Sequence, residues 1–259
     1  LLLDWGWPGE PERRFGLADY VARLERAVAA LPGPVILAGY CMGGLLALAA
    51  ALRRPARFRG LALLATPWDF HAGEEREGAA AQAMAALAPL LDPVLEAAGT
   101  LPVDAIQTMF AALDPFGVAA KYRAFGRLDP GGARARLFVA LEDWLNDGVP
   151  LAAPVARECL SGWYGRNLTA AGAWCLDGRP VRPGAWRKPA FIAIPARDRI
   201  VPPASARALA AAMPRARVHE AAAGHVGMVA GGNAETALWR PLADWVASLT
   251  RDLSRPAPL

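Results

Sequence analysis

The chain has 259 residues, of which 54% are hydrophobic and 20% are charged. This length and composition allow a sizeable core and exclude an intrinsically disordered protein. The formal net charge is +4, and it comes from arginine, since lysine occurs only at positions 121 and 188. The arginines are scattered among acidic residues, so nucleic-acid binding is not indicated, whereas an anionic substrate suits the weak positive charge.

The cysteine spacing predicts neither a disulfide framework nor a metal site. Cys41, Cys159 and Cys175 are odd in number, and none of them has the C-x-x-C or Cys/His spacing of a zinc site. Residues 31–52 carry no charge over a length that could span a membrane. Prolines and glycines interrupt them, so we expect a strand, a turn and a helix of the core. These features favour a cytoplasmic protein.

The first quarter of the chain alternates between strand and helix patterns. It opens without methionine on Leu1-Leu2-Leu3-Asp4, a run typical of a buried strand, so we expect that an amino-terminal part precedes it. Apolar residues recur at helical spacing over 17–31, and Pro32-Gly33-Pro34 ends that helix. The elements expected next are a strand at 35–38, a turn at 39–44, a helix at 45–53 and a strand at 60–65.

Residues 68–188 lack this alternation and are too long for a simple crossover, so we predict an inserted helical cap there. The cap helices are expected around 79–91, 103–113, 135–145 and 153–163. The elements expected after the cap are a strand at 191–194, a helix at 204–213, a strand at 218–222 and a helix at 235–249. This order predicts an α/β fold with a mostly parallel, doubly wound sheet, whose core comprises residues 1–67 and 189–259.

The run Gly39-Tyr40-Cys41-Met42-Gly43-Gly44 follows a predicted strand and opens a predicted helix. In this context G-x-C-x-G is the cysteine form of the nucleophile elbow of α/β-hydrolases. Gly39 and Gly43 leave room for the tight turn, and the dipole of the following helix suits a nucleophilic Cys41. The backbone N–H of Met42 then provides one donor of an oxyanion hole. The alternative is a buried structural cysteine in a glycine-rich turn.

Asp198 and His225 are the candidates for the remaining catalytic positions. In this fold the acid and then the histidine follow the nucleophile along the chain. His225 comes directly after the last predicted strand, whereas His71 lies at the cap boundary and His219 lies inside a strand. Asp198 follows the preceding strand and would hold the imidazole of His225. The alternatives are a surface-loop histidine and an aspartate paired with its flanking arginines.

These residues resemble the polyhydroxyalkanoate synthases, an α/β-hydrolase family that uses a cysteine nucleophile. The elbow is similar to the family's G-x-C-x-G-G box, and further similar segments follow the same order over essentially the whole chain. They are Asp4–Gly6, Leu64–Phe70, Trp144–Asp147 with Pro150, Asp198–Pro202 and Gly224–Gly227. We expect the family's amino-terminal part, with an early strand and its oxyanion loop, to be missing from this sequence.

The resemblance implies a cytoplasmic enzyme, at the surface of polymer granules, that polymerises (R)-3-hydroxyacyl-CoA and releases CoA. Cys41 would carry the acyl chain as a thioester, His225 would activate the thiol or the incoming hydroxyl, and Asp198 would support His225. The family's cap shields the site from water. The resemblance implies no cofactor beyond the CoA thioester substrate. The implied partners are the polymer chain and either a second copy in a homodimer or a partner synthase subunit.

Two other interpretations use the same residues. One is a cysteine-dependent hydrolase, such as an esterase, a thioesterase or a depolymerase-like enzyme, and the other is a non-catalytic granule-associated subunit. Access of water to Cys41 separates the hydrolase from the polymerase, because water would release each acyl group. Trp68 and Tyr40 are candidates for the wall of the substrate pocket, with core packing as the alternative.

Overall fold

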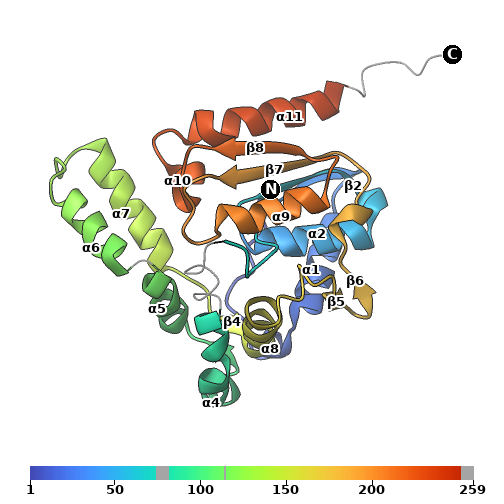
Figure 1. Ribbon diagram of the computed structural model, residues 1–259, viewed down its shortest axis with the longest axis horizontal. Coiled ribbons are helices and arrows are strands. Elements are labelled where there is room, and N and C mark those ends of the chain that lie inside the picture. Colours follow the sequence, from blue (N-terminus) through green and yellow to red (C-terminus); the bar gives the residue numbers. More distant parts are fainter. Residues whose placement is uncertain (74–81, 114, 252–259) are drawn as a thin grey trace.

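A four-stranded parallel sheet forms the centre of the molecule (Figure 1). In the computed structural model, which describes residues 1–73, 82–113 and 115–251, the strand order is β1-β2-β7-β8. The strands are β1 (Val35–Tyr40), β2 (Phe58–Leu64), β7 (Ala190–Pro195) and β8 (Arg217–Ala221). The two central strands, β2 and β7, are almost wholly buried, which explains their uninterrupted apolar sequences.

Helices cover both faces of this sheet. The first three helices below share one core cluster with the sheet, and the others share a second cluster on the opposite face. They are α1 (Leu17–Ala29), α2 (Gly43–Arg53) and α9 (Pro203–Ala212), then α10 (His225–Ala230), the π-helix η5 (Glu235–Trp239) and α11 (Arg240–Arg251). The sheet is therefore doubly wound, as its sequence predicts.

Helix α1 shows how the sequence forms these layers. Leu17, Val21, Leu24 and Val28 are three or four residues apart, so they share one side of the helix, and all four are buried. At the end of the helix the Arg57 guanidinium donates to the Val28 carbonyl oxygen at 2.9 Å. The same carbonyl oxygen also accepts the Leu31 N–H at 3.1 Å, so donors beyond the helix satisfy its last turn.

Between β2 and β7 the chain leaves the sheet and forms mainly helices. These are α4 (Ala88–Ala98), α5 (Val103–Leu113), α6 (Pro115–Phe125), α7 (Ala133–Asn146), α8 (Ala153–Arg157) and the π-helix η3 (Glu158–Gly165). Two short antiparallel pairs are β3 (Thr100–Leu101) with β4 (Leu151–Ala152), and β5 (Cys175–Leu176) with β6 (Arg179–Pro180). Short 3-10 helices are η1 (Glu12–Arg14), η2 (Pro55–Arg57) and η4 (Pro183–Ala185). The cap boundaries at 68 and 188 stay a prediction, and residues 74–81 and 114 of the predicted cap lie outside the described residues.

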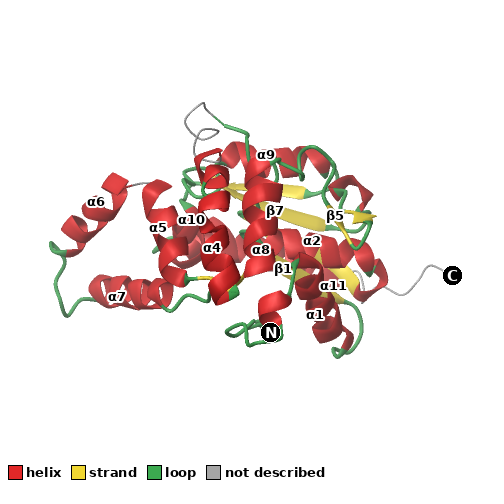
Figure 2. Ribbon diagram, turned by 90° about the horizontal axis from the view of Figure 1, so that it is seen from below, coloured by secondary structure: helices red, strands yellow, loops and turns green. Residues whose placement is uncertain are grey.

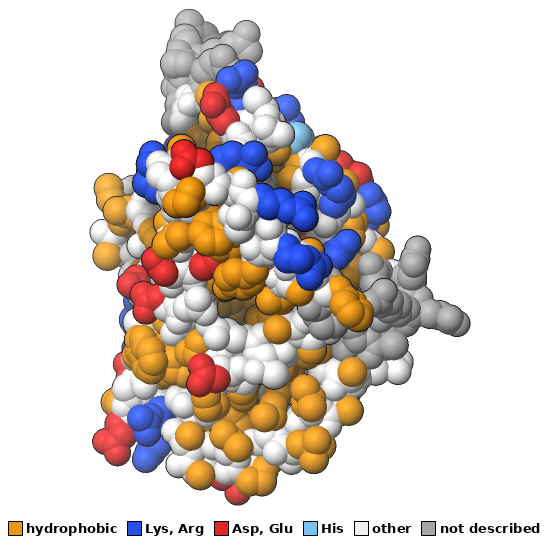
Figure 3. Space-filling view, turned by 90° about the vertical axis from the view of Figure 1, so that its left-hand side faces the viewer, with side chains coloured by type: hydrophobic (Ala, Val, Ile, Leu, Met, Phe, Trp, Pro, Cys, Tyr) orange, Lys and Arg blue, Asp and Glu red, His pale blue; other side chains and the backbone are white. Residues whose placement is uncertain are grey.

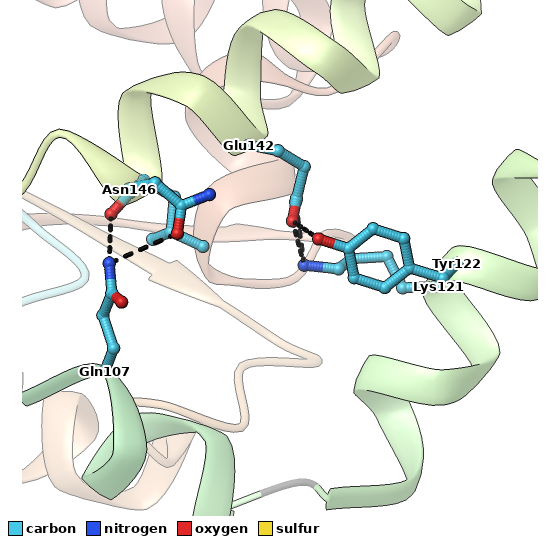
Figure 4. A network of polar contacts seen from close by, with 6 residues as sticks. Gln107, Lys121, Tyr122, Glu142 and Asn146 are labelled. Carbon is cyan, nitrogen blue, oxygen red and sulfur yellow. Dashed lines mark hydrogen bonds and ion pairs between the residues drawn. The ribbon is translucent and has the colours of Figure 1, made fainter. Parts of the chain in front are cut away.

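Helices α5, α6 and α7 form an arm that projects from the body on the side where the strands end (Figures 1 and 2). Glu142 of α7 accepts hydrogen bonds from the Lys121 ammonium and the Tyr122 hydroxyl of α6, each at 2.8 Å. Gln107 of α5 donates to the side-chain oxygen of Asn146, the last residue of α7, at 3.4 Å (Figure 4). These polar contacts join the three helices to one another.

Residues 1–4 form no strand, so this prediction is wrong. Leu1 and Leu2 are exposed, and the chain instead packs through Trp5, whose ring meets the Tyr20 ring of α1 edge-on at 5.2 Å between centres. A strand needs a neighbouring strand to receive its backbone hydrogen bonds. Within the described residues, β1 pairs with β2 alone, and residues 1–4 have no such neighbour.

Some helices also differ from the prediction. The helix expected at 79–91 is divided, because residues 82–86 are helical and α4 begins separately at Ala88, with proline in its first turn and left-handed Gly99 (φ 68°) after its end. Residues 79–81 of that prediction lie outside the described residues. The sequence does not predict α6, because its apolar residues have no clear helical periodicity. No helix in the described ranges is long and apolar enough to cross a membrane.

Candidate active site

Cys41 lies in the turn between β1 and α2. Its φ of 53° is a left-handed conformation that few residues other than glycine adopt. The Cys41 N–H donates to the carbonyl oxygen of Leu64 at the end of β2, at 2.9 Å, and the Cys41 carbonyl accepts from the Gly44 N–H at 3.0 Å. This strained turn, which leaves the cysteine partly exposed at the carboxyl end of the sheet, is the backbone conformation of a nucleophile elbow.

Two glycines of the elbow are required by close packing. A Cβ atom at Gly39 would lie 2.6 Å from the Gly43 carbonyl oxygen, and one at Gly44 would lie 2.6 Å from Cγ2 of the buried Thr66. At Gly43, by contrast, a Cβ atom would meet nothing within 4 Å. The sequence assigns the second tight position to Gly43, whereas the structure places it at Gly44, because α2 begins directly against the segment that follows β2.

Asp198 and His225 form a buried pair where β7 and β8 end. Oδ2 of Asp198 lies 2.6 Å from Nδ1 of His225, and the two side chains are 0% and 8% exposed. The other oxygen, Oδ1, accepts the backbone N–H groups of Ile200 at 2.8 Å and Val201 at 2.9 Å. Both carboxylate oxygens therefore have donors, which fixes the carboxylate and, through it, the imidazole.

His225 is the first residue of α10, whereas the sequence places it on a loop. Gly224 adopts an extended conformation before the helix, and its carbonyl oxygen accepts the Met228 N–H at 2.9 Å. The helix has only six residues, too few to show an apolar period in the sequence. The predicted position at the carboxyl end of the last strand is otherwise the one found.

The pKa of His225 is raised to about 9. Burial by itself lowers this pKa, because a charged imidazole loses its hydration, but the hydrogen bond with Asp198 and the interactions with Cys41 and with the Asp198 charge outweigh that effect. The Tyr40 ring lies against the imidazole, at 4.8 Å between ring centres. A basic imidazole held by a carboxylate is suited to accept a proton from a thiol.

The structure also describes the three remaining candidate residues, Met42, Trp68 and Tyr40. Met42 occupies the N-cap position of α2, where the first amides of a helix have no partner within it. Trp68 is buried, and its ring meets that of Trp174 edge-on at 6.4 Å. The Tyr40 hydroxyl is buried without a hydrogen-bond partner among the described residues, and burial and then charge at Cys41 raise the pKa of Tyr40. The roles of Trp68 and Tyr40 in substrate binding stay predictions.

The remaining cysteines and histidines have other surroundings. Cys159 is buried, and burial raises the pKa of its thiol, whereas Cys175 is exposed on β5. His71 and His219 each place a ring nitrogen 2.7 Å from a backbone carbonyl oxygen. In the part of the chain that the structure describes, no group of three or more His, Cys, Asp or Glu side chains could hold a metal ion.

Two structural features near the elbow could not be predicted from the sequence. Ala65, directly after β2, also has a left-handed φ of 47°, although alanine is not a residue typical of that conformation. Tyr164 of η3 is far from Cys41 in sequence, yet after burial the charge at Cys41 is the next cause that raises the pKa of Tyr164. Tyr164 and Cys41 pack against the same core cluster, which forms only in the tertiary structure.

Comparison with known proteins agrees with this architecture. Residues 6–90 match the alpha/beta hydrolase fold family. The crystal structure of a monoacylglycerol lipase from Paleococcus ferrophilus aligns with 91% of this chain and 76% of its own, with a TM-score of 0.53 at 15% identity. The chain has the α/β-hydrolase fold. The Asp198–His225 pair thus lies where this fold carries its acid and histidine, beyond the last strands of the sheet.

This chain, with its α/β-hydrolase fold, is similar in sequence to polymerase subunits. The poly(3-hydroxyalkanoate) polymerase subunit PhaC of Haloferax mediterranei is 28% identical over 95% of this chain and 51% of its own. The subunit of the same name from Allochromatium vinosum is 26% identical over 95% of this chain and 70% of its own. The resemblance to polyhydroxyalkanoate synthases is confirmed. The chain spans about half the length of the first relative.

Proposed function

We propose that this α/β-hydrolase is an acyltransferase that polymerises (R)-3-hydroxyacyl-CoA. The Cys41 thiol gives its proton to His225 and attacks the thioester carbonyl, so that the acyl group moves to Cys41 and the CoA sulfur leaves with the proton from His225. The hydroxyl of a second 3-hydroxyacyl group then attacks the Cys41 thioester and passes its proton through His225 to the Cys41 sulfur. An ester bond forms, and Cys41 returns to a thiol.

The observation that carries this proposal is the buried Asp198–His225 pair. The strained Cys41 of the elbow supports it, because Cys41 contributes to the raised pKa of His225. A pKa of about 9 makes His225 a strong enough base to accept a thiol proton, and Asp198 holds the ring in one orientation while stabilising the imidazolium. The names of the relatives, which are polymerase subunits, support transfer of the acyl group to a hydroxyl.

The first turn of α2 supports one half of an oxyanion hole. We assign the developing negative charge on the thioester oxygen to the backbone N–H of Met42, directly after the nucleophile. The space beside the Gly43 Cα is open, so an acyl group can approach this end of the helix. The positive end of the helix dipole favours the same charge.

The surface on this side of the molecule suits both halves of an acyl-CoA. Figure 3 shows the face toward which the strands β7 and β8 point, with basic side chains gathered in its upper part and apolar ones in its lower part. We assign the basic area to the phosphates of CoA and the apolar area to the acyl and polymer chains. The predicted cap, residues 68–188, would then keep water from the thioester.

The relatives are named as subunits, so we also propose that this chain acts together with another chain, either a second copy or a different synthase subunit. Size-exclusion chromatography with light scattering tests this, first on the full-length protein alone and then with acyl-CoA. A protein that polymerises as a monomer would contradict this part of the proposal.

The test of the reaction is an assay of the full-length protein with 3-hydroxybutyryl-CoA, in which CoA release and polymer are measured together. We expect one CoA released for each unit incorporated. Cys41→Ala should abolish both, while Cys175→Ala, which removes an exposed cysteine on β5, should retain both. The second variant shows whether activity depends on the thiol of Cys41 in particular or on any accessible thiol.

The other interpretations give different results in the same assay. CoA release without polymer would identify a thioesterase and overturn the polymerase proposal. Full activity in Cys41→Ala would overturn the assignment of the nucleophile. Neither CoA release nor polymer, from a folded full-length protein supplied with its partner, would favour a non-catalytic subunit.

A further inference from the structure

The segment after β2, residues 65–71, is fastened by side chains from two other parts of the chain. The Trp68 N–H donates to the Ser205 hydroxyl of α9 at 3.1 Å. The Trp68 carbonyl oxygen accepts from the hydroxyl of Thr169, a buried residue shortly after η3. We call this segment the β2 loop. Its position therefore depends on α9 and on the residues after η3, as well as on the sheet.

Asn167 makes the central bonds between the β2 loop and η3. Its side-chain Nδ2 donates to Asp69 Oδ1 at 2.7 Å, and its Oδ1 accepts the Phe70 N–H at 3.0 Å. Asp69 Oδ1 also accepts the His71 N–H at 2.9 Å. One amide side chain thus satisfies a backbone donor and a carboxylate of the same loop.

Asn167 has a strained backbone conformation. Its φ is 49°, a left-handed value that asparagine tolerates better than most residues other than glycine. Backbone strain of this kind persists only where the surrounding contacts enforce it. Here the contacts are the two side-chain bonds to the β2 loop, together with the backbone bonds of Asn167 to Trp163 and Ala171.

The β2 loop also contacts Tyr164 of η3. The Phe70 ring meets the Tyr164 ring edge-on at 4.9 Å, and the His71 ring nitrogen Nε2 lies 2.7 Å from the Tyr164 carbonyl oxygen. Tyr164 and Cys41 both pack against the same core cluster, and Thr66 of the β2 loop lies directly against Gly44 of the elbow. Burial, and then the charge at Cys41, raise the pKa of Tyr164, so its phenol stays protonated. Tyr164 belongs to the π-helix η3, a type of helix that occurs frequently at functional sites.

We propose that Asn167 is a positioning residue, which clamps the β2 loop to η3 and thereby holds the Tyr164 phenol beside Cys41. An O–H group held close to the sulfur stabilises negative charge on it, so the clamp makes Cys41 a better nucleophile. The inference rests on the proposed function only in that Cys41 is the reacting group. It assigns no contact between Asn167 and a substrate.

The test exchanges the two partners of the clamp. Asn167→Asp places a carboxylate against Asp69 and should break the clamp, because like charges repel at this distance. The double variant Asp69→Asn, Asn167→Asp restores a bond in the opposite direction, since the amide at position 69 can donate to the carboxylate at position 167. Asn167→Gly keeps the left-handed backbone and removes only the amide.

The readout is the rate at which iodoacetamide alkylates Cys41, measured in the full-length protein with Cys175→Ser, so that the other exposed cysteine does not react. We expect Asn167→Asp and Asn167→Gly to slow alkylation at pH 7 about tenfold, and the double variant to recover to within about threefold of the parent. In the acyl-CoA assay, kcat should fall by a similar factor while KM stays nearly constant, because the clamp touches no substrate.

Thermal unfolding of each variant separates positioning from stability. If Asn167→Gly reacts as fast as the parent, or if the double variant stays as slow as Asn167→Asp, the proposal is overturned. If Asn167→Asp does not fold, the comparison between Asn167→Gly and the parent decides alone. Alkylation needs no substrate, so it reports on the clamp even if the parent proves to release no CoA, which would contradict the proposed function instead.

Discussion

The Asp198 carboxylate and the His225 imidazole, 27 residues apart in the chain, meet at 2.6 Å with both side chains almost completely buried. Two backbone N–H groups, those of Ile200 and Val201, hold the other carboxylate oxygen. The acid therefore cannot turn without losing several bonds, and the orientation of the imidazole depends on it. This relationship leads to the first two predictions.

Asp198→Asn should leave the fold intact and lower kcat for CoA release about 10³- to 10⁴-fold. The amide removes the negative charge that stabilises a protonated ring, so the pKa of His225 should fall below about 9. Steady-state kinetics and a titration of the His225 ring protons by NMR measure both effects. Asp177→Asn, which changes an exposed aspartate at the surface, is the matched control and should keep full activity.

The stability of the protein should fall as the pH rises through the titration of His225. The folded-state pKa, about 9, is above the ordinary value of 6.5, so between these values the folded state binds more protons than the unfolded state. The contribution is fully present below pH 6.5 and is lost as the pH passes 9. Its size is roughly 3 kcal/mol. Urea unfolding at pH 6.5 and pH 9.5 measures it.

Other groups also titrate in this range, so the comparison requires a variant. His225→Gln should flatten the pH dependence relative to the parent, because it removes the group that takes up the proton. If the parent lost no more stability than His225→Gln between pH 6.5 and 9.5, the raised pKa of His225 would be contradicted.

Tyr40→Phe should raise the free energy of unfolding by about 1 kcal/mol. The Tyr40 hydroxyl is buried and has no hydrogen-bond partner in the described residues, so removing it relieves a desolvation cost, while the ring keeps its contact with His225. Tyr122→Phe, which removes a hydroxyl that donates to Glu142, should instead lower the free energy of unfolding by about 0.5 to 1 kcal/mol. Destabilisation by Tyr40→Phe would reveal a bond to the hydroxyl.

Gly44→Ala should destabilise the protein by about 3 kcal/mol, whereas Gly43→Ala should leave its stability within about 1 kcal/mol of the parent. The methyl group at position 44 would overlap the buried Thr66 side chain, and the one at position 43 would point into open space. Equilibrium unfolding of both variants checks the contrast. Equal effects would contradict the close approach of α2 to the segment after β2.

The sequence by itself determines the order of strands and helices in the core. The spacing of Leu17, Val21, Leu24 and Val28 predicts a helix packed on one side, and the apolar runs of β2 and β7 predict central strands. These patterns are local, because each residue's burial follows from its own element's periodicity. The G-x-C-x-G run predicts the strained turn for the same reason, since strand, turn and helix are consecutive there.

The tertiary structure decides everything that depends on contacts between distant segments. No local pattern distinguishes Gly44 from Gly43, because the difference is the position of Thr66. None indicates that Tyr164 and Cys41 pack against the same core cluster. The run of leucines at the start of residues 1–4 predicts a strand, but these residues form none, because a strand exists only where a neighbour receives its hydrogen bonds. Asp198 and His225 can be predicted as partners from their order, but their 2.6 Å contact and the raised pKa exist only once burial brings them together.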